Sequence, residues 1–192
     1  MTGKVKINLG SGHWKFDGWV NVDLNRDSLP QVCANLAAGL PFGSGTADLM
    51  HSEDFIDQLE LDQARQFLAE CHRILKPGGV LRTLTPDLEK LAYLFLHEQE
   101  RLKALWNDHV GVPLQLGTVG EIFNTGMRFA GHTFLYDAET FILLAAECGF
   151  EARRVAYQQS EVPELRGLDL RSPEDAISLY FDCYKVGDAV TR

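Results

Sequence analysis

The sequence predicts an α/β fold with a mostly parallel, doubly wound sheet. Short apolar runs alternate with amphipathic helical patterns, which is typical of a parallel sheet with helices packed on its faces. The first apolar run ends in a glycine turn, Gly10-Ser11-Gly12, and the second ends in an acid, Asp23. No helical pattern separates the last two runs, so we expect the sheet to close with an antiparallel terminal hairpin.

Seven strands are expected in chain order. Each is a short apolar run bounded by turn residues or by the ends of helical patterns, and the third is the weakest. They cover residues 5–9, 19–24, 31–36, 47–52, 80–85, 150–157 and 178–186.

Three helices are expected from apolar residues that fall on one helical face. The first runs from Leu61 to Leu75 and stops at Lys76-Pro77-Gly78-Gly79, because proline and glycine do not continue a helix. The second follows Asp87, a good N-cap residue. The third follows Asp137 and ends at Gly149.

Helical periodicity disappears between residues 106 and 131, where glycines interrupt aromatic and apolar residues. Long connections without periodicity are often functional loops. We therefore expect one domain over residues 1–192, with an elaborated loop or lid at about 106–131.

The first two connections are short. Parallel neighbours need crossovers of about a dozen residues or more, and the gaps from Leu9 to Trp19 and from Leu24 to Gln31 leave little room for a helix. The first crossover helices are therefore expected to be reduced or absent. One sheet face near the glycine turn would be thinly covered, and we expect residues 106–131 or the second subunit of a homodimer to cover it.

Composition excludes several classes of function. The 192 residues are 45% hydrophobic, enough for a substantial core, and no run approaches the roughly 18 apolar residues of a membrane span. The N-terminus leads straight into the first strand without a signal-peptide core, so a cytoplasmic protein is expected. The formal net charge of −9 argues against nucleic acid as a partner.

The cysteines and histidines are scattered. The four cysteines form no C-x-x-C pair, and we interpret them as buried hydrophobic residues in a reducing compartment. No H-E-x-x-H or comparable cluster occurs, so no metal site is expected.

Several blocks together resemble a known family. They are residues 5–23, 40–42, 75–79 and 86–91, with 131–137 and 164–166 in support. They resemble the class I S-adenosylmethionine-dependent methyltransferases, and within these the small bacterial type 11 branch. The resemblance implies a Rossmann-like fold, S-adenosylmethionine as methyl donor and S-adenosylhomocysteine as product.

The resemblance also implies a cofactor site. The glycine turn would line the methionine part of the cofactor, Asp23 would accept the ribose hydroxyls, and Leu24 would lie beside the adenine. Asn35-Leu36 corresponds to a pair near the adenine amino group, and Ser52 ends the fourth strand at the same sheet edge. The expected cofactor-binding residues are Gly10, Ser11, Gly12, Asp23, Leu24, Asn35, Leu36 and Ser52.

The sequence departs from this branch after the fourth strand. The branch commonly reads Ser-Glu-His-Phe-Ile-Glu-His-Leu, whereas this chain reads Ser-Glu-Asp-Phe-Ile-Asp-Gln-Leu over residues 52–59. Both histidines are replaced, by Asp54 and Gln58, and an acid is kept at Asp57. Asn8 also stands where many members carry an acid before the glycine turn.

Three residues are candidates for catalysis. Glu53 and Asp54 lie at the carboxyl edge of the fourth strand, where α/β sheets bind ligands. His132 can take a proton near neutral pH. Structural alternatives remain open: the two acids also suit a helix start, and His132 also suits a packed position beside aromatic residues.

The favoured function is methyl transfer from S-adenosylmethionine to a small-molecule or saccharide acceptor. The alternative is a catalytically weakened S-adenosylmethionine-binding or regulatory module, which the replaced histidines keep open. A nicotinamide-dependent oxidoreductase is disfavoured because the third glycine of the dinucleotide fingerprint is missing.

Overall fold

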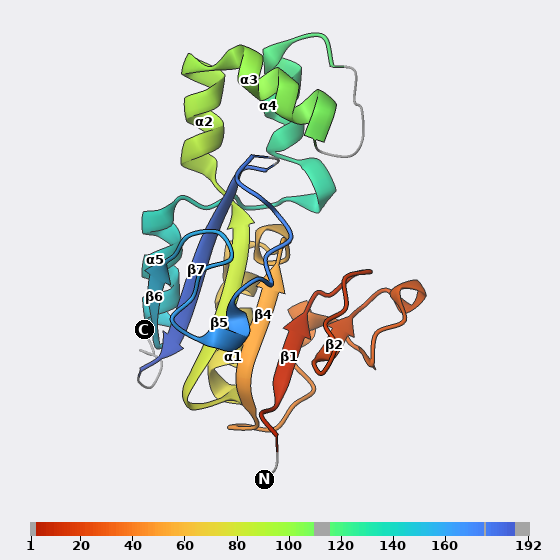
Figure 1. Cartoon of the computed structure of the whole chain (residues 1–192), viewed down its shortest axis with the longest axis vertical. Coiled ribbons are helices and arrows are strands. Elements are labelled where there is room, and N and C mark those ends of the chain that lie inside the picture. The colour runs from red at the N-terminus through yellow and green to blue at the C-terminus, as the bar shows by residue number, and fades with distance from the viewer. Residues whose placement is uncertain (1–2, 110–115, 175, 187–192) are drawn as a thin grey trace.

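A seven-stranded sheet forms the centre of the protein. The computed structural model describes residues 3–109, 116–174 and 176–186, and its strand order is β3-β2-β1-β4-β5-β7-β6 (Figure 1). β7 is antiparallel to both neighbours and the remaining pairs are parallel. The strands are β1 (Lys6–Leu9), β2 (Val20–Asp23), β3 (Val32–Cys33), β4 (Ala47–Glu53), β5 (Leu75–Pro86), β6 (Phe150–Arg154) and β7 (Ser178–Lys185). The predicted mostly parallel sheet with an antiparallel terminal pair is confirmed.

Two amphipathic helices cover one face of the sheet. α1 (Leu61–Ile74) begins with a capping box between Glu60 and Gln63. α5 (Ala138–Glu147) begins at Asp137, whose carboxylate accepts from the Thr140 amide at 2.8 Å, as the sequence predicted. Their apolar stripes join the strand residues of that face in the main core, which contains among others Ile7, Met50, Phe67, Leu81, Phe141 and Phe181.

β5 begins earlier than expected. The predicted helix stop at residues 76–79 is itself the start of the strand, which pairs with β4 through an irregularity between Ala47 and Leu49. A Cβ on Gly79 would lie 2.9 Å from the Lys76 carbonyl oxygen and 3.1 Å from that of Asp48. Only glycine fits there without displacing backbone, so the two strands lie close together at this point.

A group of helices, residues 88–131, lies beyond the carboxyl ends of the parallel strands (Figure 1). We call it the helical cap. Its core is a separate apolar cluster, which includes Leu94, Leu102 and Ile122. It contains α2 (Leu88–His97), α3 (Gln99–Ala104), the π-helix η4 (Leu105–His109), α4 (Val119–Gly126) and the 3-10 turn η5 (Phe129–Gly131).

The loop expected over residues 106–131 is therefore partly helical. Thr118 and Glu121 form a capping box that starts α4. The Thr-x-x-Glu signal was present in the sequence, but the glycines around it obscured the eight-residue helix. Residues 110–115 lie outside the described part of the chain.

The early crossovers are reduced, as predicted. No helix is described between β1 and β2. The next connections carry only the 3-10 turns η1 (Arg26–Ser28) and η2 (Leu36–Ala38), and η3 (Ile56–Gln58) follows β4. The sheet face opposite α1 and α5 therefore lacks the helices that usually cover a doubly wound sheet.

The connector between β6 and β7, residues 155–177, covers this face instead, and we call it the strap. It contains the 3-10 turn η6 (Pro163–Leu165). Leu165 packs against Trp19, Leu49 and Val80 in a third apolar cluster. The expectation that residues 106–131 cover this face is wrong, because that segment belongs to the helical cap. The strap provides cover from the same chain, so the reason for expecting a second subunit there is removed.

A buried arginine fastens the strap to the sheet. Arg82 of β5 is fully buried, and its Nε donates to Asp169 of the strap at 2.9 Å. Its Nη1 donates to Asp182 of β7 and to the strap carbonyl of Gln159, each at 3.1 Å. Both carboxylates are themselves nearly or fully buried. We call this group the Arg82 clasp; its polar groups satisfy one another out of water.

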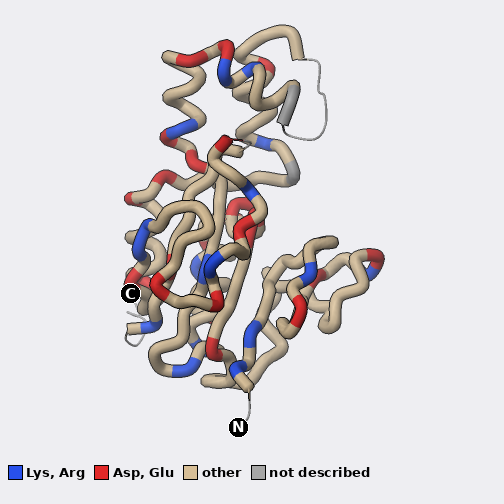
Figure 2. Tube along the Cα trace, in the orientation of Figure 1, with Lys and Arg blue, Asp and Glu red and all other residues tan. Residues whose placement is uncertain are grey.

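Charged residues are dispersed over the molecule (Figure 2). Acidic positions at the end of β4 and a basic position of the strap lie beside one another, where Asp54 and Arg171 form an ion pair. No helix within the described residues is long and apolar enough to cross a membrane.

Replacement of Arg82 is expected to destabilise the fold strongly. Arg82→Met leaves two buried carboxylates without their cation, and removing one partner of a buried pair typically costs about 3–5 kcal/mol. Urea unfolding followed by circular dichroism measures the loss. Arg153→Met is the matched control, because Arg153 pairs with Glu151 and Glu161 at the surface, and its effect should be much smaller. Equal, small effects of the two variants would contradict the role of the clasp.

Candidate active site

Two adjoining cavities lie at the carboxyl edge of β1, β4 and β5, where open α/β sheets bind ligands. The first, of about 170 Å³, we call the glycine-turn cavity. It is lined by Asn8, Gly10, Ser11, Gly12, Trp14, Phe16, His51, Glu53, Asp54, Leu170 and Arg171. The second, of about 260 Å³, lies under the helical cap, and we call it the cap cavity.

The glycine turn has the backbone shape that its residues predict. Gly10 and Gly12 have φ angles of 68° and 48°, a region that residues with a Cβ rarely adopt. A Cβ on Gly10 would also lie 3.2 Å from the Phe55 side chain. Ser11 is buried, and its Oγ has no hydrogen-bond partner among the described residues. A ligand at this wall can therefore approach the backbone closely, and the Ser11 hydroxyl is available to form a hydrogen bond with it.

Asp23 holds the turn in place. Its Oδ2 accepts from the Gly12 amide at 2.7 Å and its Oδ1 accepts from the Asn25 amide at 2.7 Å. Asp23 is thus one hydrogen bond from the cavity, although it is not among the described residues lining it. A carboxylate has about four lone-pair positions, so two remain for the ribose hydroxyls that the sequence predicts.

The other expected cofactor residues lie farther from the cavity lining. Asn35 caps η2 by accepting from the Ala37 amide, and Leu36 packs in the main core. Ser52 is fully buried on the strand. Leu24 is 63% exposed, just after β2. Their roles toward a cofactor stay predictions.

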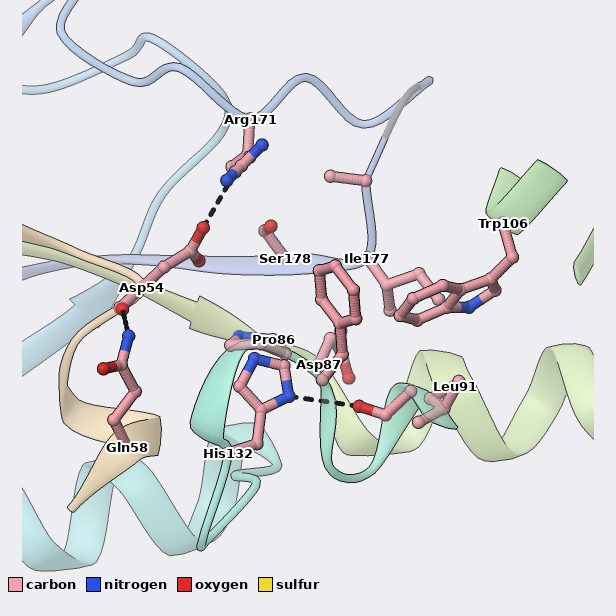
Figure 3. Close-up of a pocket in the computed structure, with 13 residues that line it drawn as sticks. Asp54, Gln58, Pro86, Asp87, Leu91, Trp106, His132, Arg171, Ile177 and Ser178 are labelled. Carbon is pink, nitrogen blue, oxygen red and sulfur yellow. Dashed lines mark hydrogen bonds and ion pairs between the residues drawn. The ribbon is translucent and has the colours of Figure 1, made fainter. Parts of the chain in front are cut away.

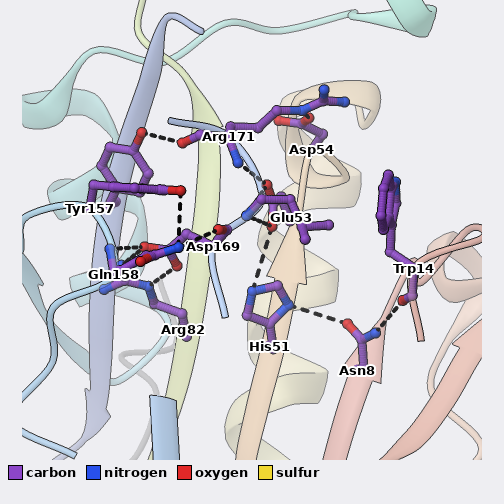
Figure 4. A network of polar contacts seen from close by, with 12 residues as sticks. Asn8, Trp14, His51, Glu53, Asp54, Arg82, Tyr157, Gln158, Asp169 and Arg171 are labelled. Carbon is purple, nitrogen blue, oxygen red and sulfur yellow. Dashed lines mark hydrogen bonds and ion pairs between the residues drawn. The ribbon is translucent and has the colours of Figure 1, made fainter. Parts of the chain in front are cut away.

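A row of buried polar side chains crosses the sheet beneath the strap (Figure 4). Asn8 donates to Asn21 Oδ1 at 2.9 Å and to the Trp14 carbonyl at 3.0 Å. Its own Oδ1 lies 3.2 Å from His51 Nδ1, which places the proton on that nitrogen. Burial, with the nearby charge of Arg82, lowers the pKa of His51 to about 3, so this imidazole is neutral. Asn8 thus supports the floor of the cavity.

Glu53 connects the sheet to the strap. Its Oε1 accepts from the amides of Leu170 and Arg171 at 3.1 and 3.0 Å (Figure 4). Burial, reinforced by the charge of Asp54, raises the pKa of Glu53 to about 7. Of the three expected catalytic residues, Glu53 faces the glycine-turn cavity only.

Asp54 and Arg171 separate the two cavities. Both line each cavity, and Arg171 Nε donates to Asp54 Oδ2 at 2.8 Å (Figure 3). Asp54 has φ 49°, a strained conformation that costs about 1–3 kcal/mol and is most often found at functional sites. The side chains are 27% and 55% exposed, and ion pairs this open contribute little stability. The ion pair therefore fixes where the two side chains lie, but separating them costs little free energy.

The cap cavity has polar and apolar walls (Figure 3). The segment after β4, the strap and the segment before α5 supply most of its polar residues, and the helical cap supplies several of its apolar residues. The polar residues are Asp54, Gln58, Asp87, His132, Arg171 and Ser178, and the apolar ones are Pro86, Leu91, Trp106, Phe129, Ala176 and Ile177, with Gly126 between them.

His132 and Asp57 form a pair at the edge of the cap cavity. His132 Nδ1 lies 3.1 Å from the Gly126 carbonyl, which fixes a proton on that nitrogen. His132 Nε2 lies 3.3 Å from Asp57 Oδ2. Burial raises the pKa of Asp57 to about 7 and lowers the pKa of His132. Asp57 Oδ2 has no other hydrogen-bond partner among the described residues, so one proton held between the two atoms would satisfy both of them.

Sequence reasoning missed Asp57 and Arg171 as members of the site. Asp57 was noted only as a retained acid, and its partner is 75 positions later in the sequence. Arg171 lies in a polar connector whose position over the sheet no local pattern reveals. Among the described residues, no three or more His, Cys, Asp or Glu side chains are grouped to hold a metal ion.

Comparison with known proteins supports a methyltransferase domain. A family model described as "Methyltransferase domain", of the type 11 branch, matches residues 18–83. An uncharacterized methyltransferase of Synechocystis sp. is 40% identical over 45 residues. This alignment covers 23% of the present chain and 21% of the relative, so it spans about a fifth of that protein.

Solved structures share the fold over nearly the whole chain. A SAM-dependent methyltransferase from Archaeoglobus fulgidus superposes with a TM-score of 0.58 at 12% identity, covering 96% of this chain and 87% of that one. A SAM-dependent methyltransferase from Thermotoga maritima, described as a possible histamine N-methyltransferase, has a TM-score of 0.55 at 18% identity, with 96% and 84% covered. The chain thus contains a segment similar to the methyltransferase-domain family, and its sheet has the fold of solved S-adenosylmethionine-dependent methyltransferases.

Proposed function

We propose that the protein transfers a methyl group from S-adenosylmethionine to a small-molecule or saccharide acceptor. The observation that carries this proposal is the pair of cavities divided by Asp54 and Arg171. One cavity has the glycine turn expected of a nucleoside site, and the other has room for a second molecule. Methyl transfer needs two ligands to meet end to end, because the rate depends largely on holding them in line.

The glycine-turn cavity fits the methyl donor. Ser11 Oγ and His51 Nε2 are buried without hydrogen-bond partners among the described residues, and a bound polar ligand would satisfy them. The backbone of the turn admits close approach, and Asp23 lies behind Gly12. When bound, S-adenosylmethionine supplies an electrophilic methyl group on a sulfonium.

The acceptor's proton has a destination in the cap cavity. With one proton on His132 Nδ1 for the Gly126 carbonyl and one held between Nε2 and Asp57 Oδ2, neither nitrogen of His132 is free to take another, so a different group must receive the acceptor's proton. Asp54 lies at the boundary that the methyl group would cross. In this proposal Asp54 takes the acceptor's proton, and His132 and Asp57 form the neighbouring wall.

Replacement of Asp23 is expected to weaken cofactor binding. Asp23→Ala removes the acceptor of the Gly12 amide and the proposed ribose acceptor, a loss of about 1–3 kcal/mol. Titration calorimetry with S-adenosylmethionine and with S-adenosylhomocysteine measures the change. Asp27→Ala, an exposed acid in the following turn, is the matched control and should bind as the wild type does.

The same titrations test the rival functions. Unchanged affinity for the Asp23 variant would contradict the ribose assignment. Tight binding of NAD with no binding of S-adenosylmethionine would contradict methyl transfer. Binding without methyl transfer to any of a broad set of acceptors would favour a binding or regulatory module.

The free energy of unfolding is expected to depend on whether Asp57 is protonated. Burial raises the pKa of Asp57 from 3.8 to about 7, so the folded state binds this proton more tightly than the unfolded chain. The resulting stabilisation is complete below about pH 4 and is lost as the pH rises through about 7. Relative to Asp57→Asn, the wild type should lose up to about 4 kcal/mol over this window.

Urea unfolding of both proteins at several pH values gives this difference. Asp62→Asn, whose side chain is 91% exposed on α1, measures what a solvent-facing carboxylate contributes in the same window. A difference between wild type and Asp57→Asn that does not vary with pH would show that Asp57 is ionised throughout.

A further inference from the structure

The polar and apolar walls of the cap cavity lie at opposite ends (Figure 3). Asp54, Gln58 and His132 lie toward the end that adjoins the glycine-turn cavity, whereas Leu91 and Trp106 lie toward the other end. A saccharide carries hydroxyl groups around its whole ring, whereas Leu91 offers no hydrogen bond and Trp106 offers one donor, its Nε1, which is unpaired among the described residues. Most hydroxyl groups at this end would therefore lose hydrogen bonds to water without replacement. The cavity instead suits a molecule with one polar end and an apolar body.

The charges along the cavity wall are paired. Asp54 is bound to Arg171, and Asp87 lies 3.5 Å from Arg154. Burial raises the pKa of Asp57 to about 7, and the His132–Asp57 pair is neutral overall while it holds one proton between its facing atoms. The wall therefore provides no unbalanced charge to attract an ionic acceptor, and burying an ion without a partner is costly. This favours an uncharged acceptor.

Aromatic side chains form part of the apolar end. Trp106 and Phe129 pack edge to face, with ring centroids 5.2 Å apart and planes at 81°. Such an arrangement presents ring faces and edges to a third ring. An engineered apolar cavity of about 150 Å³ holds benzene, and the cap cavity is about 260 Å³. A single substituted aromatic ring is of the right size.

The groups at the polar end select among hydroxyl compounds. A carboxylate such as Asp54 is a weak base, and a weak base removes a proton most readily from an acidic hydroxyl. A phenol, with a pKa of about 10 as in tyrosine, is more acidic by about six units than water at about 15.7. A carbohydrate hydroxyl lacks the aromatic ring that stabilises the oxyanion.

We infer that the methyl acceptor is a phenol, an uncharged aromatic hydroxyl compound whose oxygen lies at the Asp54–His132 end of the cap cavity. The inference rests on the proposed function and narrows its acceptor class. The phenol oxygen forms the new O–C bond with the methyl group. The C–S bond breaks with its electron pair left on sulfur, and the hydroxyl proton passes to the Asp54 carboxylate.

A series of 4-alkylphenols tests this assignment. Phenol and its 4-methyl, 4-ethyl and 4-propyl derivatives are titrated into the protein with S-adenosylhomocysteine bound, and tryptophan fluorescence follows binding. Each added CH₂ should tighten binding about fourfold, because about 0.8 kcal/mol accompanies the burial of one CH₂. Methylation of the same phenols with labelled S-adenosylmethionine, separated as aryl methyl ethers, provides the second readout.

Variants of the apolar end supply the control. Trp106→Ala and the milder Phe129→Leu should reduce the gain per CH₂ while leaving S-adenosylhomocysteine affinity unchanged. Two variants are used because Trp106 is only 6% exposed and its removal could unfold the cap. Tyr93→Ala, on the exposed side of α2, should behave as the wild type.

The outcomes separate the inference from the proposed function. If S-adenosylhomocysteine binds but phenols do not, or if affinity is flat along the alkyl series, the acceptor class is wrong and the proposed function stands. Methylation of monosaccharides in preference to phenols would also show that the acceptor class is wrong while the proposed function stands. If neither S-adenosylmethionine nor S-adenosylhomocysteine binds, the proposed function fails and the phenol assignment with it.

Discussion

The buried contact of Arg82 with Asp169 and Asp182 is the constraint on which the rest of the site depends. A guanidinium in the middle of a sheet is costly unless carboxylates and carbonyls surround it. Here the strap supplies one carboxylate and two carbonyls. If the strap moved away from the sheet, Arg82 would lose these hydrogen bonds or become exposed to water. With Asp169 fixed, the next residues, Leu170 and Arg171, are brought to Glu53 and Asp54. One ion network thus closes the glycine-turn cavity and builds the partition beside it.

The strap compensates for a missing layer of the fold. Short early connections leave the sheet face beneath the glycine turn without helices, and that face carries polar residues such as Asn8, Asn21 and His51. A helix would bury an apolar stripe there, but an irregular segment can direct carbonyls and amides at polar partners. The three features therefore depend on one another: the reduced helices leave a polar sheet face open, and the strap covers it with polar groups of its own. The cost is a covering segment that depends on a few buried polar contacts.

The sequence predicted the sheet well, because burial and strand ends leave local signals. The sequence predicted Asp87 and Asp137 as helix caps and Gly10 and Gly12 as turn residues, and the structure gives both glycines positive φ angles. Long-range packing had no such signal. Arg82 reads as an isolated charge in an apolar strand, and its partners are 87 and 100 positions later in the sequence. For the same reason the sequence suggested Asp54 and His132 as candidates but not the Arg171 and Asp57 that hold them.

Hydrogen–deuterium exchange with and without S-adenosylhomocysteine tests the central claim most directly. The claim is that a nucleoside ligand binds between the glycine turn and the strap. Ligand should slow amide exchange in residues 8–14 and 168–172 together, because the ligand would contact the turn and the Glu53-bound strap amides at once. Residues 99–104 of α3, which are not among the residues lining either cavity, should exchange unchanged. Protection confined to the helical cap, with residues 8–14 unaffected, would contradict the account.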